Sequence, residues 1–445
     1  MEQEEEPFDS PTKSMFTLLQ GTIGRNAFYL MFTLCAQRLL SPLFFNSSSL
    51  PPKKMAGNFN VLTAMTHDIQ SGYKDCYLTA VSVLEAYSAQ IDRHESYLHA
   101  IIELAPRALL METARRLDEE RKISGIRGPM HGIPMLVKDN IDTHPDLGVE
   151  STRAGTCALK GSQPKVNSPA IDRFVKAGAI ILGKANMSEL MWFKRIDYLS
   201  KLPTSDIRLR PTMGIISNVG VTPLTPRSDT IGPMTKCARD VAVLLDAMVD
   251  PAATSIPAGG YVSSLSSDWS GLRIGSLDPE PWLLDDVIVK PVKGAKEQEI
   301  RETKAAYAKL KGILGSKFHD NVDFISPSES STDANGTDHF GNILYNDFCP
   351  ALNKYLEGLD NSAQERLVEA QSFHMFPEDR QKSDDYVRQK CGKEGIDKTL
   401  AQYNIDVIIG PADSLLTNIG PAAGKLYFLF ELLVPTFDII SQGRL

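Results

Sequence analysis

The sequence predicts an α/β fold, in which helices pack on both faces of a sheet. Two observations support this prediction: segments with apolar residues at helical spacing alternate with short apolar runs, and glycine or proline separates them. The chain has 445 residues, 42% of them hydrophobic and 23% charged, which is an ordinary composition for a globular protein with a sizeable core. We expect one large domain.

Two early segments carry apolar residues on one helical face. The first covers residues 78–91, where Thr79 is placed to cap the helix, and the second follows Pro106, which suits a first helical turn. Residues 97–104 lie between them and are predicted to form a strand. A helix, a strand and a second helix therefore open the fold.

The same alternation continues along the chain. Residues 135–138 form a short apolar run, residues 171–175 give a helical face that Gly178 ends, residues 179–182 have the composition of a buried strand, and residues 241–248 predict another helix. Helices that alternate with short strands in this way favour a sheet with helices on both faces.

Two segments differ from this pattern. Residues 1–54 begin with acidic residues and contain an apolar run of about ten residues, which is too short to cross a bilayer and lacks the basic start of a secretory signal. We interpret them as a poorly ordered or non-native extension, and we expect a cytoplasmic protein without a membrane span. Residues 326–336 are rich in serine and aspartate and are predicted to be a surface connection.

Charge and composition indicate the class of ligand. The net charge of −8, without a long Lys/Arg run, argues against a nucleic-acid partner and favours a small-molecule substrate. The six cysteines form no CxxC pair and the eight histidines show no metal-ligand spacing. We therefore expect reduced thiols, no metal and no organic cofactor.

The strongest local signal is Lys138, which ends the apolar run 135–138 after a turn rich in glycine and proline. Burial disfavours the ammonium form of lysine, so a lysine at this position could be neutral near pH 7 and act as a base toward a hydroxyl group. The alternative from the residues alone is an exposed lysine that pairs with Asp139 or Asp142.

Five blocks, in this order along the chain, resemble the amidase signature family: residues 128–142, 183–189, 210–214, 229–234 followed by Asp240, and 404–414. The resemblance covers residues 55–424 and is nearest to fungal members. It implies a mixed central sheet covered by helices on both faces. It also implies hydrolysis of a carboxamide to a carboxylate and an amine by a Ser-cisSer-Lys triad, in which Lys138 is the lysine and a small-molecule amide is the substrate.

The stretch that carries both serines in intact members is missing from this sequence. Residues 194–209 stand where relatives have several dozen more residues, and they contain no glycine-serine-rich pattern. Their only serines, Ser200 and Ser205, lack the neighbouring glycines that a tight turn with oxyanion-binding N–H groups needs. We therefore predict an incomplete sheet and a chain that keeps Lys138 but does not catalyse.

Residues 425–445 also depart from the family pattern and are interpreted as an aberrant tail, from either a retained intron after Gly424 or divergence. Two alternatives to an inactive amidase stay open. One is residual amidase activity that uses Ser200 or Ser205, and the other is a non-catalytic binding or regulatory protein with a pocket near Lys138. The particular amide and the oligomeric state are left open.

Overall fold

The computed structural model describes residues 59–149, 152–191, 207–266, 268, 271–283, 294–360, 376–411, 414–425, 427–432 and 434–441. The predicted extension at residues 1–54, Ser200 and Ser205 lie outside these ranges.

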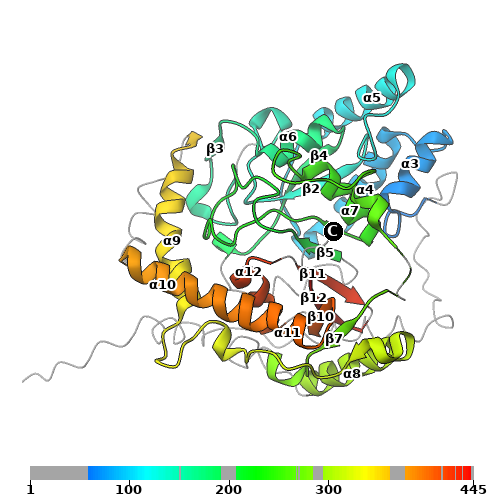
Figure 1. The fold of residues 1–445 in the computed structure, drawn as a ribbon. Helices are drawn as coiled ribbons and strands as arrows, with labels where there is room; N and C mark the ends of the chain where they lie inside the picture. The colour runs from blue at the N-terminus through cyan, green and yellow to red at the C-terminus, as the bar shows by residue number, and fades with distance from the viewer. Residues whose placement is uncertain are drawn as a thin grey trace, which may run out of the picture.

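Helices and short strands alternate through the described residues, as predicted (Figure 1). The α-helices are α3 (Thr66–Lys74), α4 (Ala80–Leu98), α5 (Arg107–Ser124), α6 (Pro169–Lys176), α7 (Ala238–Met248), α8 (Ala295–Leu314), α9 (His339–Leu356), α10 (Pro377–Val387), α11 (Lys398–Gln402) and α12 (Ile419–Ala423). A π-helical segment, Arg388–Asp397, joins α10 to α11. The strands are β1 (Ile101–Leu104), β2 (Pro134–Lys138), β3 (Gln163–Pro164), β4 (Ile180–Ala185), β5 (Ile207–Arg210), β6 (Met234–Thr235), β7 (Ile274–Ser276), β8 (Phe318–His319), β9 (Leu359–Asp360), β10 (Val407–Pro411), β11 (Tyr427–Leu432) and β12 (Val434–Ser441).

The strands form sheets of mixed direction, which confirms the predicted α/β class. A three-stranded sheet has the order β1-β4-β2, in which β1 is antiparallel and β2 parallel to the central strand β4. A seven-stranded sheet has the order β6-β5-β11-β12-β10-β7-β8, and β3 pairs with β9. In Figure 1 the three-stranded sheet lies among α3 to α7 in the upper half, and α8 to α12 surround the larger sheet below.

The segment interpreted as an aberrant tail supplies two strands to the larger sheet. β11 and β12 pair with each other in antiparallel fashion, β11 also pairs with β5, and β12 also pairs with β10. The hairpin therefore joins the β5-β6 pair to the β10-β7-β8 group through backbone hydrogen bonds. The origin of residues 425–445 remains a hypothesis.

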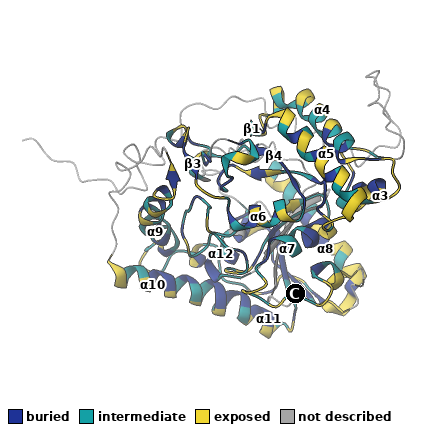
Figure 2. Ribbon diagram, turned by 90° about the horizontal axis from the view of Figure 1, so that it is seen from above, coloured by how far each residue is buried: buried dark blue, intermediate teal, exposed yellow. Residues whose placement is uncertain are grey.

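Hydrophobic burial follows the two sheets. One large cluster of buried residues packs α3 to α7 onto the three-stranded sheet, with Leu84, Ile171 and Ile180 among its fully buried side chains. A second cluster joins α9 to α12 and β10. Figure 2 shows the helices α4 and α5 with exposed residues on their outer faces and buried residues toward the sheet. This one-sided burial is what the helical spacing of apolar residues predicted.

The start of α4 follows from its cap, as predicted. The Thr79 hydroxyl accepts a hydrogen bond from the Ser82 amide at 3.0 Å, and the Ser82 hydroxyl accepts one from the Thr79 amide at 2.9 Å. This reciprocal arrangement satisfies two N–H groups that have no partner inside the helix.

The predicted strand at residues 97–104 is wrong over its first half. Helix α4 continues to Leu98 and ends only at His99, which takes the left-handed conformation with φ of 48°. The carboxylate of Glu95, a residue of α4, then accepts hydrogen bonds from the amides of Ala100 and Ile101. These two bonds hold the turn between α4 and β1. The strand is therefore confined to β1.

Replacing Thr79 by alanine is expected to lower the free energy of unfolding by about 1 kcal/mol, because the Ser82 amide loses its acceptor. Urea unfolding followed by circular dichroism measures the loss. Thr79→Ser keeps the hydroxyl and should stay near the wild type; equal losses in both variants would show that the cap hydrogen bond is not the cause.

The segment 326–336 is less superficial than predicted. Ser330 is buried, and its carbonyl accepts a hydrogen bond from the Cys391 thiol, with a donor–acceptor distance of 3.1 Å. The Tyr386 hydroxyl donates to the carbonyl of Thr332 at 2.7 Å. The segment is thus held against α10 and the π-helical segment, and the serine-rich composition gave no sign of these contacts.

Candidate functional site

Lys138 is the last residue of β2 and lies beside Ala185 of β4. The preceding turn is fixed at Gly132, whose φ of +77° favours glycine and whose amide donates to the carbonyl of Gly178 at 2.8 Å. Side chains alternate along a strand, so Val137 is buried while Lys138 points to the other face and reaches solvent.

The surroundings of Lys138 favour its neutral amine. Although the side chain reaches solvent, the protein around it lowers the pKa of Lys138 by desolvation, and the negative charge of Asp229 opposes this shift. Among the described residues, Lys138 has no ion pair and no hydrogen-bonded side-chain partner. The alternative pairing with Asp139 or Asp142 is therefore wrong.

Asp229 is the acid whose charge acts on Lys138. Its carboxylate accepts hydrogen bonds from the amides of Leu224 at 2.8 Å and Thr225 at 3.0 Å, which close the loop that carries it. Burial raises the pKa of Asp229 to about 6, and the two N–H groups and the charge of Arg210 oppose this shift. The charge of Asp229, and with it the ammonium form of Lys138, is therefore favoured above pH 6.

A buried lysine lies on the other face of the same sheet. Lys184 in β4 is fully buried, and its ammonium group donates to the carbonyl of Ile141 and, at 3.1 Å, to the hydroxyl of Thr152. Burial lowers the pKa of Lys184 to about 8, while the charges of Asp139, Asp142 and Glu103 favour its ammonium form. Asp139 and Asp142, which do not pair with Lys138, are thus neighbours of Lys184.

Both aspartates have further partners. The Asp139 carboxylate accepts a hydrogen bond from the Gly155 amide at 2.9 Å, and the Asp142 carboxylate accepts one from the Tyr355 hydroxyl of α9 at 2.6 Å. Burial raises the pKa of both groups, that of Asp142 to about 6, against the influence of these hydrogen bonds and of Lys184. This network joins the turn after β2 to the helix α9, more than two hundred residues later.

Sequence reasoning gave Lys184 no role beyond its place in a family block. The available signal was its position, because a lysine within a strand whose six residues are otherwise apolar or small must either reach solvent or find buried acceptors. The acceptors come from segments far apart in the chain, so the sequence alone does not identify them.

Three residues elsewhere have the order of a serine-histidine-aspartate relay. His339 places one ring nitrogen 3.1 Å from a carboxylate oxygen of Asp333 and the other 2.9 Å from the hydroxyl of Ser383, and its ring stacks on Tyr386 with 4.2 Å between centroids. Ser383 is only 2% exposed, however, so its hydroxyl is not open to a substrate carbonyl. We interpret the group as a packing contact between α9 and α10.

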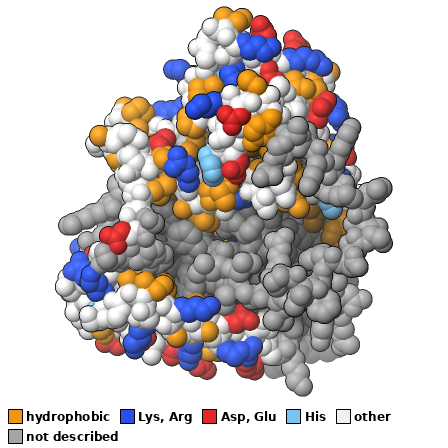
Figure 3. All heavy atoms as spheres, turned by 90° about the vertical axis from the view of Figure 1, so that its right-hand side faces the viewer, with side chains coloured by type: hydrophobic (Ala, Val, Ile, Leu, Met, Phe, Trp, Pro, Cys, Tyr) orange, Lys and Arg blue, Asp and Glu red, His pale blue; other side chains and the backbone are white. Residues whose placement is uncertain are grey.

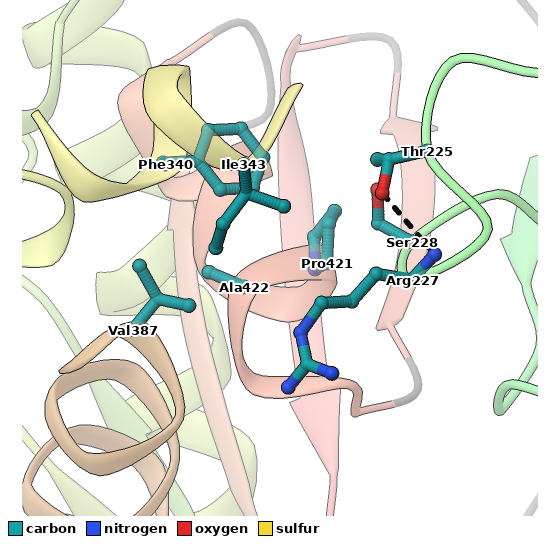
Figure 4. Close-up of a pocket in the computed structure, with 8 residues that line it drawn as sticks. All are labelled: Thr225, Arg227, Ser228, Phe340, Ile343, Val387, Pro421 and Ala422. Carbon is teal, nitrogen blue, oxygen red and sulfur yellow. Dashed lines mark hydrogen bonds between the residues drawn. The ribbon is translucent and has the colours of Figure 1, made fainter. Parts of the chain in front are cut away.

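A small pocket lies between the loop that precedes Asp229 and the helices α9, α10 and α12 (Figure 4). Figure 4 shows polar side chains on one side and apolar ones on the other: Thr225, Arg227 and Ser228 face Phe340, Ile343 and Val387, with Pro421 and Ala422 between them. Arg227 pairs with Asp384. Lys138 does not line this pocket.

On the face in Figure 3, basic, acidic and hydrophobic side chains are interspersed over the described residues. Within the described ranges, no three His, Cys, Asp or Glu side chains are grouped as metal ligands, and no helix has the length and apolar character needed to cross a bilayer.

The family model named Amidase matches residues 82–204 and 208–417, which is more than half of the chain. The chain belongs to the amidase family. This match confirms the resemblance found in the five sequence blocks. The match also breaks between residues 204 and 208, inside the stretch 194–209 where the serine-bearing segment is predicted to be missing.

Curated relatives of this amidase-family chain match over part of their length. Probable amidase At4g34880 of Arabidopsis thaliana is 28% identical over 307 residues, which are 56% of this chain and 59% of the relative. One of the subunits of the glutamyl-tRNA(Gln) amidotransferase of Chloroflexus aurantiacus is 30% identical over 248 residues, which are 44% of this chain and 50% of the relative. The chain thus spans about half to three fifths of these relatives.

Solved structures support the fold. The native peptide amidase from Stenotrophomonas maltophilia superimposes with a TM-score of 0.65 and 21% identity, over 85% of this chain and 93% of that one. At this identity the likeness concerns the fold alone, and it agrees with the predicted mixed sheet covered by helices.

Proposed function

We propose that this chain is an amidase-family protein that retains the lysine base, Lys138, but does not hydrolyse amides. The observation that supports the proposal most directly is the break in the family match between residues 204 and 208. No serine in the stretch 194–209 has the glycine-rich surroundings of a nucleophile with oxyanion-binding amides.

The isolation of Lys138 supports the same proposal. In the triad that the family resemblance implies, the lysine accepts a proton from a bridging serine, which in turn activates the nucleophilic serine. No described hydroxyl is hydrogen-bonded to Lys138, so a described serine or threonine is not in place to be deprotonated. A base without a nucleophile to activate gives little rate enhancement.

The ligand that we propose for this site is a small amide, bound without turnover. A reducing, cytoplasmic location fits Cys76, Cys157, Cys237 and Cys391, which form no disulfide within the described residues.

The test combines folding with covalent labelling. The purified full chain is expected to melt in a cooperative transition, to react with no fluorophosphonate probe, and to hydrolyse simple amides no faster than its Lys138→Met variant. The peptide amidase from Stenotrophomonas maltophilia, assayed in parallel, shows that the probe and the amides are competent.

Labelling would contradict the proposal if it occurred at Ser200 or Ser205 and disappeared in Ser200→Ala or Ser205→Ala. That outcome would support residual amidase activity. A cooperative transition that a small amide shifts to higher temperature, without labelling, would support binding. A chain without a transition would instead be a non-functional product.

A further inference from the structure

We propose that Lys184 is a positioning residue for Lys138: it holds Asp139 and Asp142 on the opposite face of the sheet, so that the Lys138 amine has no carboxylate partner there. This inference depends on the role proposed for Lys138 above. It concerns the protonation of Lys138 and not turnover, so the two proposals can fail separately.

The strand register places the two lysines on opposite faces. In the parallel pair of β2 and β4, Val137 lies opposite Lys184 and Lys138 lies opposite Ala185. Because successive side chains of a strand alternate between faces, Lys184 projects with Val137 into the core while Lys138 projects the other way. An offset of one position along the paired strands thus places Lys184 in the core, where it is fully buried, and Lys138 on the face where it reaches solvent.

The contacts of Lys184 hold the turn that follows Lys138. Its ammonium group donates to the carbonyl of Ile141, three residues after Lys138, and to the hydroxyl of Thr152. The turn is also fixed by backbone bonds from the Asp139 amide to the carbonyl of Ala185 at 3.1 Å, and from the Ile141 amide to the carbonyl of Lys138 at 3.0 Å. Lys184 therefore touches the segment in which both aspartates lie.

Different acidic groups act on the two lysines. Asp139, Asp142 and Glu103 act on Lys184, and Arg153 adds a second cation that pairs with Glu103 at 2.8 Å. The one acid that acts appreciably on Lys138 among the described groups is Asp229. Asp139 is adjacent to Lys138 in the chain, so without the Lys184 ammonium its uncompensated charge would act on Lys138.

The experiment measures the proton on Lys138 directly. The lysines of the folded full chain are reductively methylated with ¹³C-formaldehyde, and the pH titration of each methyl resonance is followed by NMR; Lys138→Arg identifies the resonance of Lys138. Lys138 reaches solvent and can be methylated. We expect a wild-type pKa below the ordinary lysine range.

Lys184→Met should raise the pKa of Lys138 by about one unit, a tenfold change in its proton affinity, because the aspartates lose their buried cation. Lys184→Arg should restore the wild-type titration by keeping the charge. Lys236→Met is the matched control, because Lys236 also donates to backbone carbonyls, those of Val61 and Ala64, but lies outside the Asp139 and Asp142 group.

A folded Lys184→Met variant with the wild-type titration of Lys138 would overturn the inference, as would an equal shift in Lys236→Met. If Lys184→Met does not fold, Asp142→Asn decides the question. Lys184 already compensates the charge of Asp142, so this change should leave the pKa of Lys138 within about 0.3 unit of the wild type. A clear fall would show that Asp142 acts on Lys138 directly and would refute the proposal.

Discussion

Replacing Lys184 by methionine is expected to lower the free energy of unfolding by about 3–5 kcal/mol, which is the usual loss when one partner of a buried charged group is removed. The Lys184 side chain is fully buried. The carbonyl of Ile141 and the hydroxyl of Thr152 lose their donor, and the buried carboxyl groups of Asp139 and Asp142 lose the nearby cation.

Urea unfolding of the full chain measures this loss, with Lys122→Met as the control. Lys122 in α5 also has an acidic neighbour, but its side chain is 72% exposed beside Glu119, so its removal should change little. Domains are typically stable by about 5–15 kcal/mol, so the Lys184 variant should retain a folded population in the absence of denaturant. If Lys184→Met changed the free energy of unfolding as little as Lys122→Met, the buried ammonium would not be important for stability.

The sequence predicted those features that depend on neighbouring residues. The cap at Thr79, the start of α5 after Pro106 and the end of α6 near Gly178 all follow from local backbone chemistry, and the structure confirms them. The strand predicted at residues 97–104 was too long because residues at the end of α4 are as compatible with a strand as with a helix. The choice there depends on His99 and on the bonds made by Glu95.

Features that depend on distant segments were not predictable in this way. Lys138 lies at a strand end, as predicted. Its alternative partners, Asp139 and Asp142, are instead neighbours of Lys184, because the two lysines are offset by one position along the paired strands and project to opposite faces of the sheet. The hydrogen bond from Tyr355 to Asp142 joins residues that no local pattern relates. The pairing of β11 and β12 between β5 and β10 likewise depends on the whole sheet.

Stability should depend on pH through Asp229, whose pKa burial raises to about 6. In the unfolded chain this carboxyl loses its proton near pH 4, so between about pH 4 and pH 6 the folded state binds more protons than the unfolded state. The contribution of Asp229 is therefore fully present below pH 4 and is lost as the pH rises through 6. The shift corresponds to about 3 kcal/mol at most, and partial contact with solvent reduces it.

Asp229→Asn removes this dependence without removing the hydrogen bonds, because one carboxylate oxygen accepts both the Leu224 and the Thr225 amides and the asparagine carbonyl can do the same. Urea unfolding at pH 4, 5, 6 and 7 should show that wild-type stability falls relative to the variant across this range. The remaining slope includes Asp142, whose pKa burial also raises. Asp92→Asn, a change at an exposed residue, should retain the wild-type slope, and a slope in Asp229→Asn equal to that of the wild type would show that folding does not raise the pKa of Asp229.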